Sequence, residues 1–359
     1  MSESRLRVAV LGAGTVGREV VRAFEEWPDR LARDGGPRLE LVGIAVQDVE
    51  GARRRGLPAG LLTDAPAHLV ADPDTDVIVE LMGGAEPAHT LIAAALSAGK
   101  AVVTANKHVI AHHGPELEAT ARRSRAALRF EAAVGGGIPV LGPLAAELAG
   151  NRVVAVRGIV NGTTNYILTA MTDEGRGYEE VLAAAQAAGY AEADPAGDVE
   201  GHDAVNKLVI LARLAFGVWI DPADVSSIAS PGGPGGGRAG ITGVTSGDIA
   251  DAARDGNVIK LLAVAERSGD GLNASVVPAL LARDSALGRT GGVLNRIEID
   301  AEPVGTVAFS GPGAGGEATS SAVLGDLLAI ARQAGSTWAG LPIAGRLAPA
   351  AGRLAQTAR

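Results

Sequence analysis

The sequence contains no cysteine among its 359 residues. This absence excludes a disulfide framework, a thiolate nucleophile and a zinc site built on cysteine. Aromatic residues make up only 3% of the chain while hydrophobic residues make up 47%, so the cores must be built mainly from Ala, Val, Leu and Ile. No apolar run approaches the roughly 18 residues of a membrane-spanning helix. A chain of this length is expected to form about two or three domains.

Positive charge is also scarce. The 32 Lys and Arg residues are outnumbered by 41 Asp and Glu residues, which gives a formal net charge of −9. A nucleic-acid partner requires a basic face, and a membrane surface requires a basic amphipathic helix. The N-terminal segment passes directly into a strand-and-turn motif, which leaves no room for a signal peptide. We therefore expect a soluble, cytoplasmic protein with no nucleic-acid or membrane partner.

Glycine is abundant, with 50 residues, and several of these glycines fall at motif positions. Gly12, Gly14 and Gly17 match the pattern G-x-G-x-x-G between a buried strand and a helix. The first glycine allows a tight turn, the second lets the backbone approach a pyrophosphate, and the third permits close helix packing. The helix N-terminus at Thr15 and Val16 supplies amide donors and a favourable dipole. The motif predicts a dinucleotide site.

Three further apolar segments, at 39–46, 76–83 and 100–106, alternate with helical patterns and predict a parallel α/β sheet. An acid at the end of the second strand favours NAD, whereas an arginine there favours the phosphate of NADP. Asp48 indicates NAD, and the arginines at 53–55 would serve NADP unless they form an exposed helix end. The choice between NAD and NADP stays open.

Polar residues follow the fourth strand. Lys107 comes directly after it, and ligands bind beyond the carboxyl ends of strands in open α/β sheets. A lysine here would bind a substrate oxygen or transfer a proton, although a surface lysine that caps the strand has the same pattern. His108, His112 and His113 come next without acids at ligand spacing. We interpret them as exposed loop and helix residues and not as a metal site.

Two polar turns follow later in the chain. The segment 130–144 places three consecutive glycines close to Glu131, where backbone oxygens could coordinate a hard cation. The same turn would also suit close approach of a cofactor or a simple crossover between domains. The residues at 161–164, Asn-Gly-Thr-Thr, suit a polar substrate, but equally suit capping of a helix that starts near Asn165.

The segment 188–207 carries the densest group of acids in the chain and ends on Lys207. Glycine and proline interrupt its first half, which predicts a loop, whereas the pattern becomes helical from about His202. Asp203 and Lys207 are spaced to lie on one face of that helix. The segment suits a small, positively charged substrate that exchanges a proton, or alternatively a solvated acidic loop. Its acids are Glu192, Asp194, Asp198, Glu200 and Asp203.

Together these motifs resemble homoserine dehydrogenase. The resemblance implies an enzyme that interconverts L-homoserine and L-aspartate 4-semialdehyde by hydride transfer with NAD or NADP. The reaction belongs to the biosynthesis of threonine, methionine and isoleucine. The resemblance spans most of the chain in the expected order, and its motifs are GAGTVG at 12–17, TANK at 104–107, EAAVGGGIPV at 131–140, GIVNGTTNYIL at 158–168, the segment 188–207, and GAGGEATSSAVLGDL at 313–327.

The resemblance also implies roles for individual residues. Lys107 and Lys207 match the catalytic lysines at the reacting oxygen, one or both of them in proton transfer. The substrate would be bound by Glu192, Asp198, Asp203 and Lys207, together with Asn161 and Thr163. The cofactor would be bound by Gly12, Gly14, Thr15, Val16, Gly17, Asp48, Thr104, Asn106, Lys107, Gly313 and Gly315. A monovalent cation site, structural and suited to sodium, matches Glu131, Val134, Gly136 and Ile138, mostly through backbone carbonyls.

These roles agree with the chemistry of the substrate. Its ammonium group requires carboxylates, which the acidic segment supplies. Hydride delivery to the aldehyde carbon creates an alkoxide, and a lysine can stabilise this charge and donate the proton. The nicotinamide carries the hydride chemistry, so a bound cation is not needed for that step.

The chain departs from the family pattern in four places. Gln47 stands where an arginine is common in NADP-using relatives, and Pro312 stands where relatives often carry an arginine that would contact a phosphate. The segment 230–240 is unusually rich in glycine, and we expect a flexible connection or, secondarily, a lid. The chain ends about 30 residues after the last motif. We therefore expect a short form that lacks the regulatory amino-acid-binding domain of many relatives and shows no threonine feedback through such a domain.

The expected architecture is a discontinuous Rossmann-type domain, residues 1–130 and 310–359, with an α+β domain at 131–309 inserted into it. The inserted domain is expected to have a mostly antiparallel sheet, to bind the substrate and to pair two subunits as a homodimer. One alternative is another NAD(P)-dependent amino-acid dehydrogenase that acts on a semialdehyde or an imine. The other is a catalytically inactive nucleotide-binding regulatory protein, which the two lysines and the acidic loop argue against.

Overall fold

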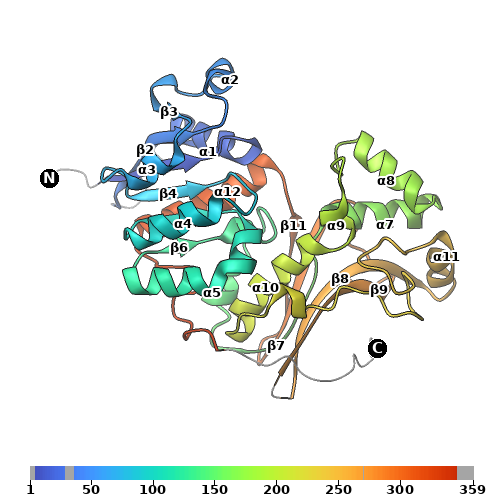
Figure 1. Cartoon of the computed structure of the whole chain (residues 1–359). Helices are drawn as coiled ribbons and strands as arrows, with labels where there is room; N and C mark the ends of the chain where they lie inside the picture. Colours follow the sequence, from blue (N-terminus) through green and yellow to red (C-terminus); the bar gives the residue numbers. More distant parts are fainter. Residues whose placement is uncertain (1–4, 29–35, 270, 346–359) are drawn as a thin grey trace. The chain divides into compact units, whose positions relative to one another are not determined.

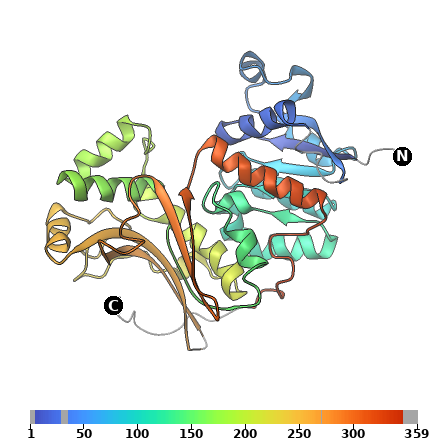
Figure 2. The same cartoon turned by 180° about the vertical axis from the view of Figure 1, so that it is seen from behind.

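The computed structural model describes residues 5–28, 36–269 and 271–345, and these residues fall into two compact units. The first unit comprises residues 1–146 and 314–341, and the second comprises residues 147–313 and 342–359. Both units are drawn in Figure 1 and, from behind, in Figure 2. Each unit is built around its own sheet.

The first unit contains a six-stranded parallel sheet with the strand order β3-β2-β1-β4-β5-β6. Residues Val8 to Leu11 and Val77 to Val79 are fully buried, because helices cover the central strands on both faces. The order reverses between β1 and β4, the position at which such sheets bind ligands. The strands are β1 (Arg5–Leu11), β2 (Arg38–Ala45), β3 (Leu62–Thr63), β4 (Val77–Glu80), β5 (Ala101–Thr104) and β6 (Leu128–Arg129).

Helices pack on both faces of this sheet. Figures 1 and 2 show α4 and α5 on one face and α1 and α12 on the other. Val323 and Leu327 of α12 join Val8 and Val20 in one hydrophobic cluster, so the returning chain completes the core. The helices are α1 (Thr15–Glu26), α2 (Val49–Arg54), α3 (Pro66–Ala71), α4 (Ala88–Ser97), α5 (Lys107–Ser124), α6 (Leu141–Ala145) and α12 (Gly316–Ala331), with short 3₁₀ turns at Ala59–Leu61 and Glu131–Ala133.

The second unit contains a five-stranded antiparallel sheet with the order β11-β10-β7-β8-β9. Its strands are β7 (Arg152–Ile159), β8 (Asn257–Ser268), β9 (Gly271–Ala282), β10 (Leu294–Glu302) and β11 (Gly305–Pro312). Its helices are α7 (Gly162–Glu174), α8 (Tyr178–Ala187), α9 (Ala196–Val199), α10 (His202–Phe216) and α11 (Ser246–Arg254), with a 3₁₀ turn at Pro222–Asp224. Most of α10 is buried, and this helix packs against β7, β8 and β9. The predicted fold class, a parallel dinucleotide-binding sheet and an antiparallel α+β unit, is confirmed.

The boundaries between the units differ from the expected ones. Residues 131–146 belong to the first unit. Within it, the Glu131 carboxylate accepts hydrogen bonds from the amides of Leu141 and Gly142 in α6, and its own amide donates to Asp326 of α12. The return to the first unit ends at residue 341, whereas the prediction extended it to residue 359. Residues 346–359 of that expected segment lie outside the described residues. Strand patterns in the sequence do not reveal such side-chain contacts.

Two local expectations need adjustment. The acidic segment is not entirely loop, since α9 forms one short helical turn immediately after Pro195. Helix α7 begins at Gly162 and not near Asn165, because the Asn161 side chain caps it by accepting a hydrogen bond from the Thr164 amide. The segment 230–240 folds into successive turns, and a bridge between Ile228 and Ala239 spans most of it.

Candidate active site

The glycine-rich turn of the first unit has the shape that close approach of a phosphate requires. Gly12 has φ +98°, and a Cβ added to it would lie 2.7 Å from the Leu81 carbonyl. A Cβ added to Gly17 would lie 2.0 Å from the Gly12 carbonyl oxygen. Gly14, by contrast, has no atom within 4 Å of such a Cβ and caps the N-terminus of α1. The first and third glycines thus fix the turn, and the second leaves open space before the helix dipole.

A second helix N-terminus lies beside this turn. Gly315, with φ +122°, precedes α12, and a Cβ added to Gly316 would lie only 2.8 Å from the Thr15 carbonyl oxygen. Helices α1 and α12 pack along each other, and Arg22 of α1 lies 3.5 Å from Glu317 of α12. Two adjacent helix N-termini present free amides and positive dipole ends, which suit a pyrophosphate.

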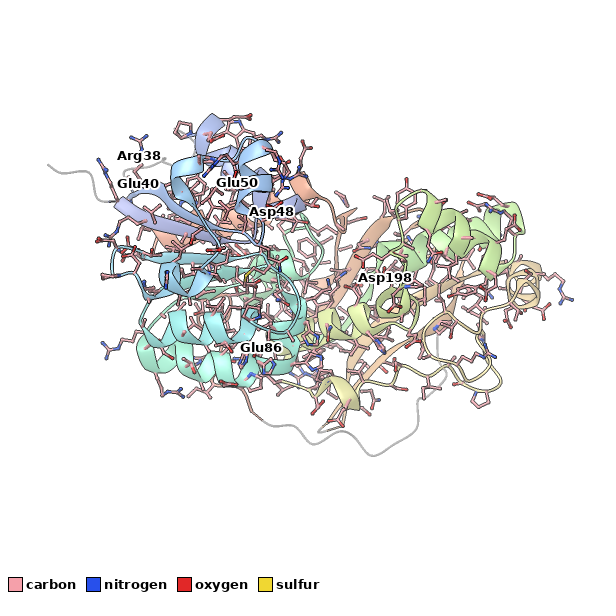
Figure 3. The ribbon with its side chains drawn as sticks, turned by 45° about the horizontal axis from the view of Figure 1, so that its top comes forward. Arg38, Glu40, Asp48, Glu50, Glu86 and Asp198 are labelled. Carbon is pink, nitrogen blue, oxygen red and sulfur yellow. The ribbon has the colours of Figure 1, made fainter. Side chains whose placement is uncertain are left out.

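At the end of β2, Asp48 caps the next helix. Its Oδ1 accepts a hydrogen bond of 2.8 Å from the Gly51 amide of α2. Arg53, exposed on the same helix, lies 3.0 Å from Glu50. Figure 3 shows Asp48 and Glu50 at this turn. Asp48 therefore has a structural role that the sequence analysis did not assign, at the position where an acid would meet the ribose of NAD.

Glu80 was missed by the sequence analysis, although it organises the loops at this edge of the sheet. The side chain is fully buried, and its Oε1 accepts hydrogen bonds from the amides of Met82 (2.8 Å) and Gly83 (3.3 Å). Its Oε2 accepts a hydrogen bond of 2.6 Å from the Thr104 hydroxyl. Burial raises the pKa of Glu80. The available signal was an acid at the carboxyl end of an otherwise apolar strand.

Thr104 and Asn106 continue this network. The Thr104 hydroxyl oxygen accepts the Asn106 amide hydrogen bond at 2.9 Å. The Asn106 side chain donates to the Gly84 carbonyl (2.8 Å) and accepts from the Val109 amide (3.1 Å), which caps α5. Lys107 is the first residue of α5, directly beyond β5. The network thus holds Lys107 at the carboxyl edge of the parallel sheet.

The turn predicted to bind a cation is held by its own carboxylate. Glu131 Oε1 accepts hydrogen bonds of 2.8 Å from the amides of both Val140 and Leu141, and Oε2 accepts one of 2.7 Å from Gly142. Burial, with a smaller contribution from the Asp326 charge, raises the pKa of Glu131. Backbone N–H groups already bind both oxygens of the Glu131 carboxylate. The oxygens that remain at this turn for a cation are therefore those of backbone carbonyls.

The backbone of that turn runs through left-handed conformations. Gly135 and Gly136 have φ values of +76° and +60°, which only glycine adopts readily. A Cβ added to Gly137 would lie 2.7 Å from the Ala318 carbonyl oxygen, so the turn also packs tightly against α12. The three glycines are therefore required by conformation and by close packing.

In the second unit, the structure brings four of the predicted substrate residues together. Lys207 Nζ donates hydrogen bonds to Asp203 Oδ2 (2.7 Å) and to the Val160 carbonyl (2.6 Å). The Asn161 amide nitrogen donates to the same Asp203 oxygen (2.9 Å) and to Asp198 Oδ1 (2.7 Å). The side chains of Lys207 and Asp203 are only 10% and 12% exposed. Two carboxylates, one amide and one amine thus form a largely buried polar group.

The other two predicted substrate residues lie outside this polar group. Thr163 donates a hydrogen bond of 2.9 Å to the Tyr190 carbonyl. Glu192 is exposed, and in the described part of the chain no contact joins its carboxylate to the group. Its backbone carbonyl accepts a hydrogen bond of 3.0 Å from Gln186. The two carboxylates of the group, Asp198 and Asp203, suit a cation such as an ammonium.

Gly313, a predicted cofactor residue, belongs to the second unit and lies against Asn295 of β10. A Cβ added to Gly313 would lie 1.7 Å from Asn295 Oδ1, so a larger residue here would have to displace the Asn295 side chain. Among the described residues, neither the nitrogen nor the oxygen of the buried Asn295 side-chain amide has a hydrogen-bond partner. The sequence pattern gave no signal for Asn295, because an alternating strand carries many polar residues that face solvent.

Comparison with known proteins decides the family. A sequence model of homoserine dehydrogenase matches residues 139–328, and one of the NAD-binding domain of homoserine dehydrogenase matches residues 12–131. The chain belongs to the homoserine dehydrogenase family. Its activity is that of a homoserine dehydrogenase in amino-acid biosynthesis, with an NAD(P)-binding domain.

Relatives and solved structures cover most of the chain. Homoserine dehydrogenase of Corynebacterium glutamicum is 44% identical over 355 residues, which are 95% of this chain and 77% of that protein. That of Mycobacterium leprae is 47% identical over 335 residues, covering 92% and 73%. A homoserine dehydrogenase structure from Thiobacillus denitrificans has a TM-score of 0.87 at 36% identity, covering 94% of this chain and 79% of that chain.

A hyperthermophilic archaeal homoserine dehydrogenase, solved in complex with NADPH, is also similar. Its TM-score is 0.76 at 26% identity, and the match covers 92% of this chain and 98% of that chain. Within residues 5–28, 36–269 and 271–345, no helix has both the length and the apolar character needed to cross a bilayer.

Proposed function

We propose that the polar group of the second unit binds the amino-acid end of homoserine and supplies the proton for its hydroxyl. The observation that carries this proposal is the buried pair of Lys207 and Asp203, whose Nζ and Oδ2 are 2.7 Å apart. A lysine in this environment is a proton donor held at one point by a carboxylate and a carbonyl. The acids around it match a substrate that carries an ammonium group.

Each side chain then has a distinct task. Asp198 and Asp203 attract the ammonium, and Asn161 holds the two carboxylates at fixed positions by donating to both. When hydride reaches the aldehyde carbon, the oxygen becomes an alkoxide, and Lys207 donates the proton that produces the hydroxyl. The reverse reaction uses the same lysine as base. Glu192 and Thr163 would complete the binding of the amino acid, and Lys107 is the second candidate for proton transfer.

For the cofactor, we propose that the N-termini of α1 and α12 bind the pyrophosphate of NAD or NADP. The open space at Gly14 and the adjacency of Gly316 to Thr15 support this position. Thr104, Asn106 and Lys107 lie at the carboxyl edge of the same sheet, where the nicotinamide is expected. Asp48 favours NAD and the arginines at 53–55 favour NADP, and the bound NADPH belongs to the archaeal relative.

We propose a structural monovalent cation, suited to sodium, at the turn around Glu131. The donors would be the backbone carbonyls of Glu131, Val134, Gly136 and Ile138. The left-handed glycines of this turn support the proposal, because they give the backbone the sharp bends that a site of backbone carbonyls requires. A cation here would stabilise the turn against α12 and would take no part in hydride transfer.

The protein is further proposed to work as a homodimer in the cytoplasm, through its second unit. Two exposed large hydrophobic side chains of this unit, Ile228 and Leu280, lie near one edge of the sheet. Leu280 belongs to β9, and Ser226, close to Ile228, is bridged to Ser275 of the same strand. Exposed apolar side chains at a sheet edge are typical of a surface that another chain covers.

The test is homoserine-dependent reduction of NAD or NADP by the purified protein, repeated with Lys207→Ala. We expect turnover with at least one cofactor and a kcat about 10²- to 10⁴-fold lower in the variant, since its proton donor is missing. Lys100→Ala is the matched control, because Lys100 belongs neither to the polar group of the second unit nor to the proposed cofactor residues. Its side chain donates a hydrogen bond to the Asp72 carbonyl. Nucleotide affinity should be unchanged in both variants.

Two outcomes would contradict the proposal, and they are distinguishable. If Lys207→Ala turned over homoserine at nearly the normal rate, another group would carry the proton. If the unmodified protein bound nucleotide but turned over homoserine with neither cofactor, the substrate assignment itself would be wrong.

A further inference from the structure

Two helices of the first unit bring together histidines and carboxylates that have no role in the proposed reaction. His89 lies near the start of α4, and His113 and Glu116 lie on α5. One ligand atom from each of these three side chains lies within 4.8 Å of the others. The sequence pattern indicated no acids near His113, and this interpretation is wrong, because Glu116 stands one turn away on the same helix.

His89 lies between two carboxylates. Its Nδ1 is 3.2 Å from Glu86 Oε1, and its Nε2 is 3.3 Å from Glu116 Oε2. The second contact lacks hydrogen-bond geometry, so among the described residues the buried Nε2 atom has no hydrogen-bond partner. The ring of His113 stacks on that of His89, with centroids 3.9 Å apart and an angle of 18°. Figure 3 shows Glu86 beside α4 and α5.

We propose that His89, His113 and Glu116 bind a divalent transition-metal ion of the zinc class, with water as the fourth ligand. Glu86, at Nδ1 of His89, would orient the ring so that Nε2 faces the ion. Imidazole nitrogen and carboxylate oxygen are the ligands that such ions prefer when thiolates are absent. Two imidazoles and one carboxylate supply three donors, and the carboxylates of Glu116 and Glu86 together offset the charge of a divalent ion. Three protein ligands and one water give the four ligands of a tetrahedral site.

Little movement is needed for ligation. In a tetrahedral zinc site with bonds of about 2.0 to 2.1 Å, two donor atoms lie roughly 3.3 Å apart. The present spread of up to 4.8 Å therefore has to shorten by about 1.5 Å, which side-chain rotations can supply. The two rings must turn out of their stack to direct their nitrogens at one point, and rotation about the Cβ–Cγ bond permits this without moving either helix. The side chains are partly exposed at this surface, so an ion has access.

The site would connect three segments of the first unit. Ligation joins α4 to α5, and the contact of Glu86 with His89 Nδ1 connects the site to the loop that follows β4. That loop is already bound to the start of α5 by the hydrogen bond from Asn106 to the Gly84 carbonyl. A bound ion would thus stabilise the first unit by mass action, without requiring any change in the catalytic residues.

The test uses metal-free full-length protein titrated with Zn²⁺ in a calorimeter and with Co²⁺ in a visible spectrometer. We expect a site with one ion per chain, the intense visible bands of tetrahedral Co²⁺, and a rise in Tm with Zn²⁺. His89→Ala and His113→Ala should each weaken Zn²⁺ binding by about tenfold or more and abolish the tetrahedral bands. Homoserine turnover of both variants should stay normal, which shows that they are folded.

His112→Ala is the matched control. His112 neighbours His113 on α5 but stacks on His108, with ring centroids 4.3 Å apart, and does not belong to the proposed site. Its loss should leave the tetrahedral Co²⁺ bands intact. The proposal is overturned if the unmodified protein shows no tetrahedral Co²⁺ spectrum. It is also overturned if His113→Ala binds Zn²⁺ as tightly as the unmodified protein does, or if His112→Ala loses as much affinity for Zn²⁺ as His113→Ala.

Discussion

Single buried polar side chains determine the shape of each part of the candidate site. Glu80 binds two backbone amides and a hydroxyl, and Glu131 binds three backbone amides. Asn161 connects two carboxylates and also caps a helix. Leaving any of these partners buried and unpaired would cost about 1 to 3 kcal/mol each. Each side chain therefore fixes one turn in one conformation.

Lys260 is a buried cation that the proposed reaction does not use. It lies on β8 and donates hydrogen bonds to Asn165 Oδ1 (2.9 Å) and Thr169 Oγ1 (3.1 Å). Burial lowers its pKa to about 8, opposed by the charge of Asp173. The unfolded chain keeps the ordinary value of 10.5. Below pH 8 the lysine is charged in both states, and its burial lowers the stability of the fold.

Between pH 8 and 10.5 the unfolded chain holds the proton that the folded chain has lost, so the free energy of unfolding rises with pH. We predict that Lys260→Met removes this rise. The free energy of unfolding of the variant minus that of the unmodified protein should fall by at most about 3 kcal/mol over this window. Urea unfolding of both proteins across the range measures it. If the difference in free energy of unfolding did not change with pH, burial would not lower the pKa of Lys260.

At the scale of elements, the loops after β4 and β5 are joined by one chain of hydrogen bonds. Glu80 connects the amides of Met82 and Gly83 to Thr104, and Thr104 connects to Asn106, which caps α5. These loops lie at the carboxyl edge of the parallel sheet, where the cofactor is proposed to bind. The network therefore fixes the conformation of these two loops in the protein without a ligand.

We predict that Glu80→Ala weakens binding of the preferred cofactor by about tenfold or more, because two amides and a hydroxyl lose their acceptor. The free energy of unfolding should fall by roughly 2 to 4 kcal/mol for the same reason. Cofactor affinity is measured by fluorescence titration well below the Tm of the variant. Glu80→Gln keeps one acceptor oxygen, so its cofactor affinity and its free energy of unfolding should each fall by less. Unchanged affinity in the alanine variant would separate this network from cofactor binding.

Most elements could be predicted from the sequence, while the contacts between them could not. The apolar runs 76–83 and 100–106 contain the strands β4 and β5, and the helical pattern from His202 is α10. These signals are local, since strands and helices repeat over a few residues. The short helix α9 was missed because one helical turn among prolines and glycines has no periodicity to detect.

At the scale of the whole molecule, the chain forms two units with separate cores, and the second carries the surface proposed to pair two subunits. Its sheet has β9 at one edge and β11 at the other. Ile228 and Leu280, on or near β9, are 62% and 44% exposed, whereas side chains of this type are usually buried. Burying them against a second copy would supply part of the free energy of association.

We predict that the protein sediments with twice the mass of one chain. Replacing both Ile228 and Leu280 by arginine should shift it toward the mass of one chain, because charge would have to be buried in the interface. Val304→Arg is the control, since Val304 is 51% exposed but follows β10 at the opposite end of the sheet. If the double variant still sedimented as a dimer, or if the control dissociated equally, the interface would lie elsewhere.

The sequence by itself determined the features that depend on neighbouring residues. The glycines of the first turn are required by backbone conformation and close packing, and Asp203 meets Lys207 because residues four apart share a helix face. Only the tertiary structure decided which distant groups meet. It placed Asp198 with Asp203 through Asn161, Glu80 beneath two loops, and His89 against His113. The physical reason is that local geometry repeats along a chain, whereas distant contacts depend on strand order and helix packing.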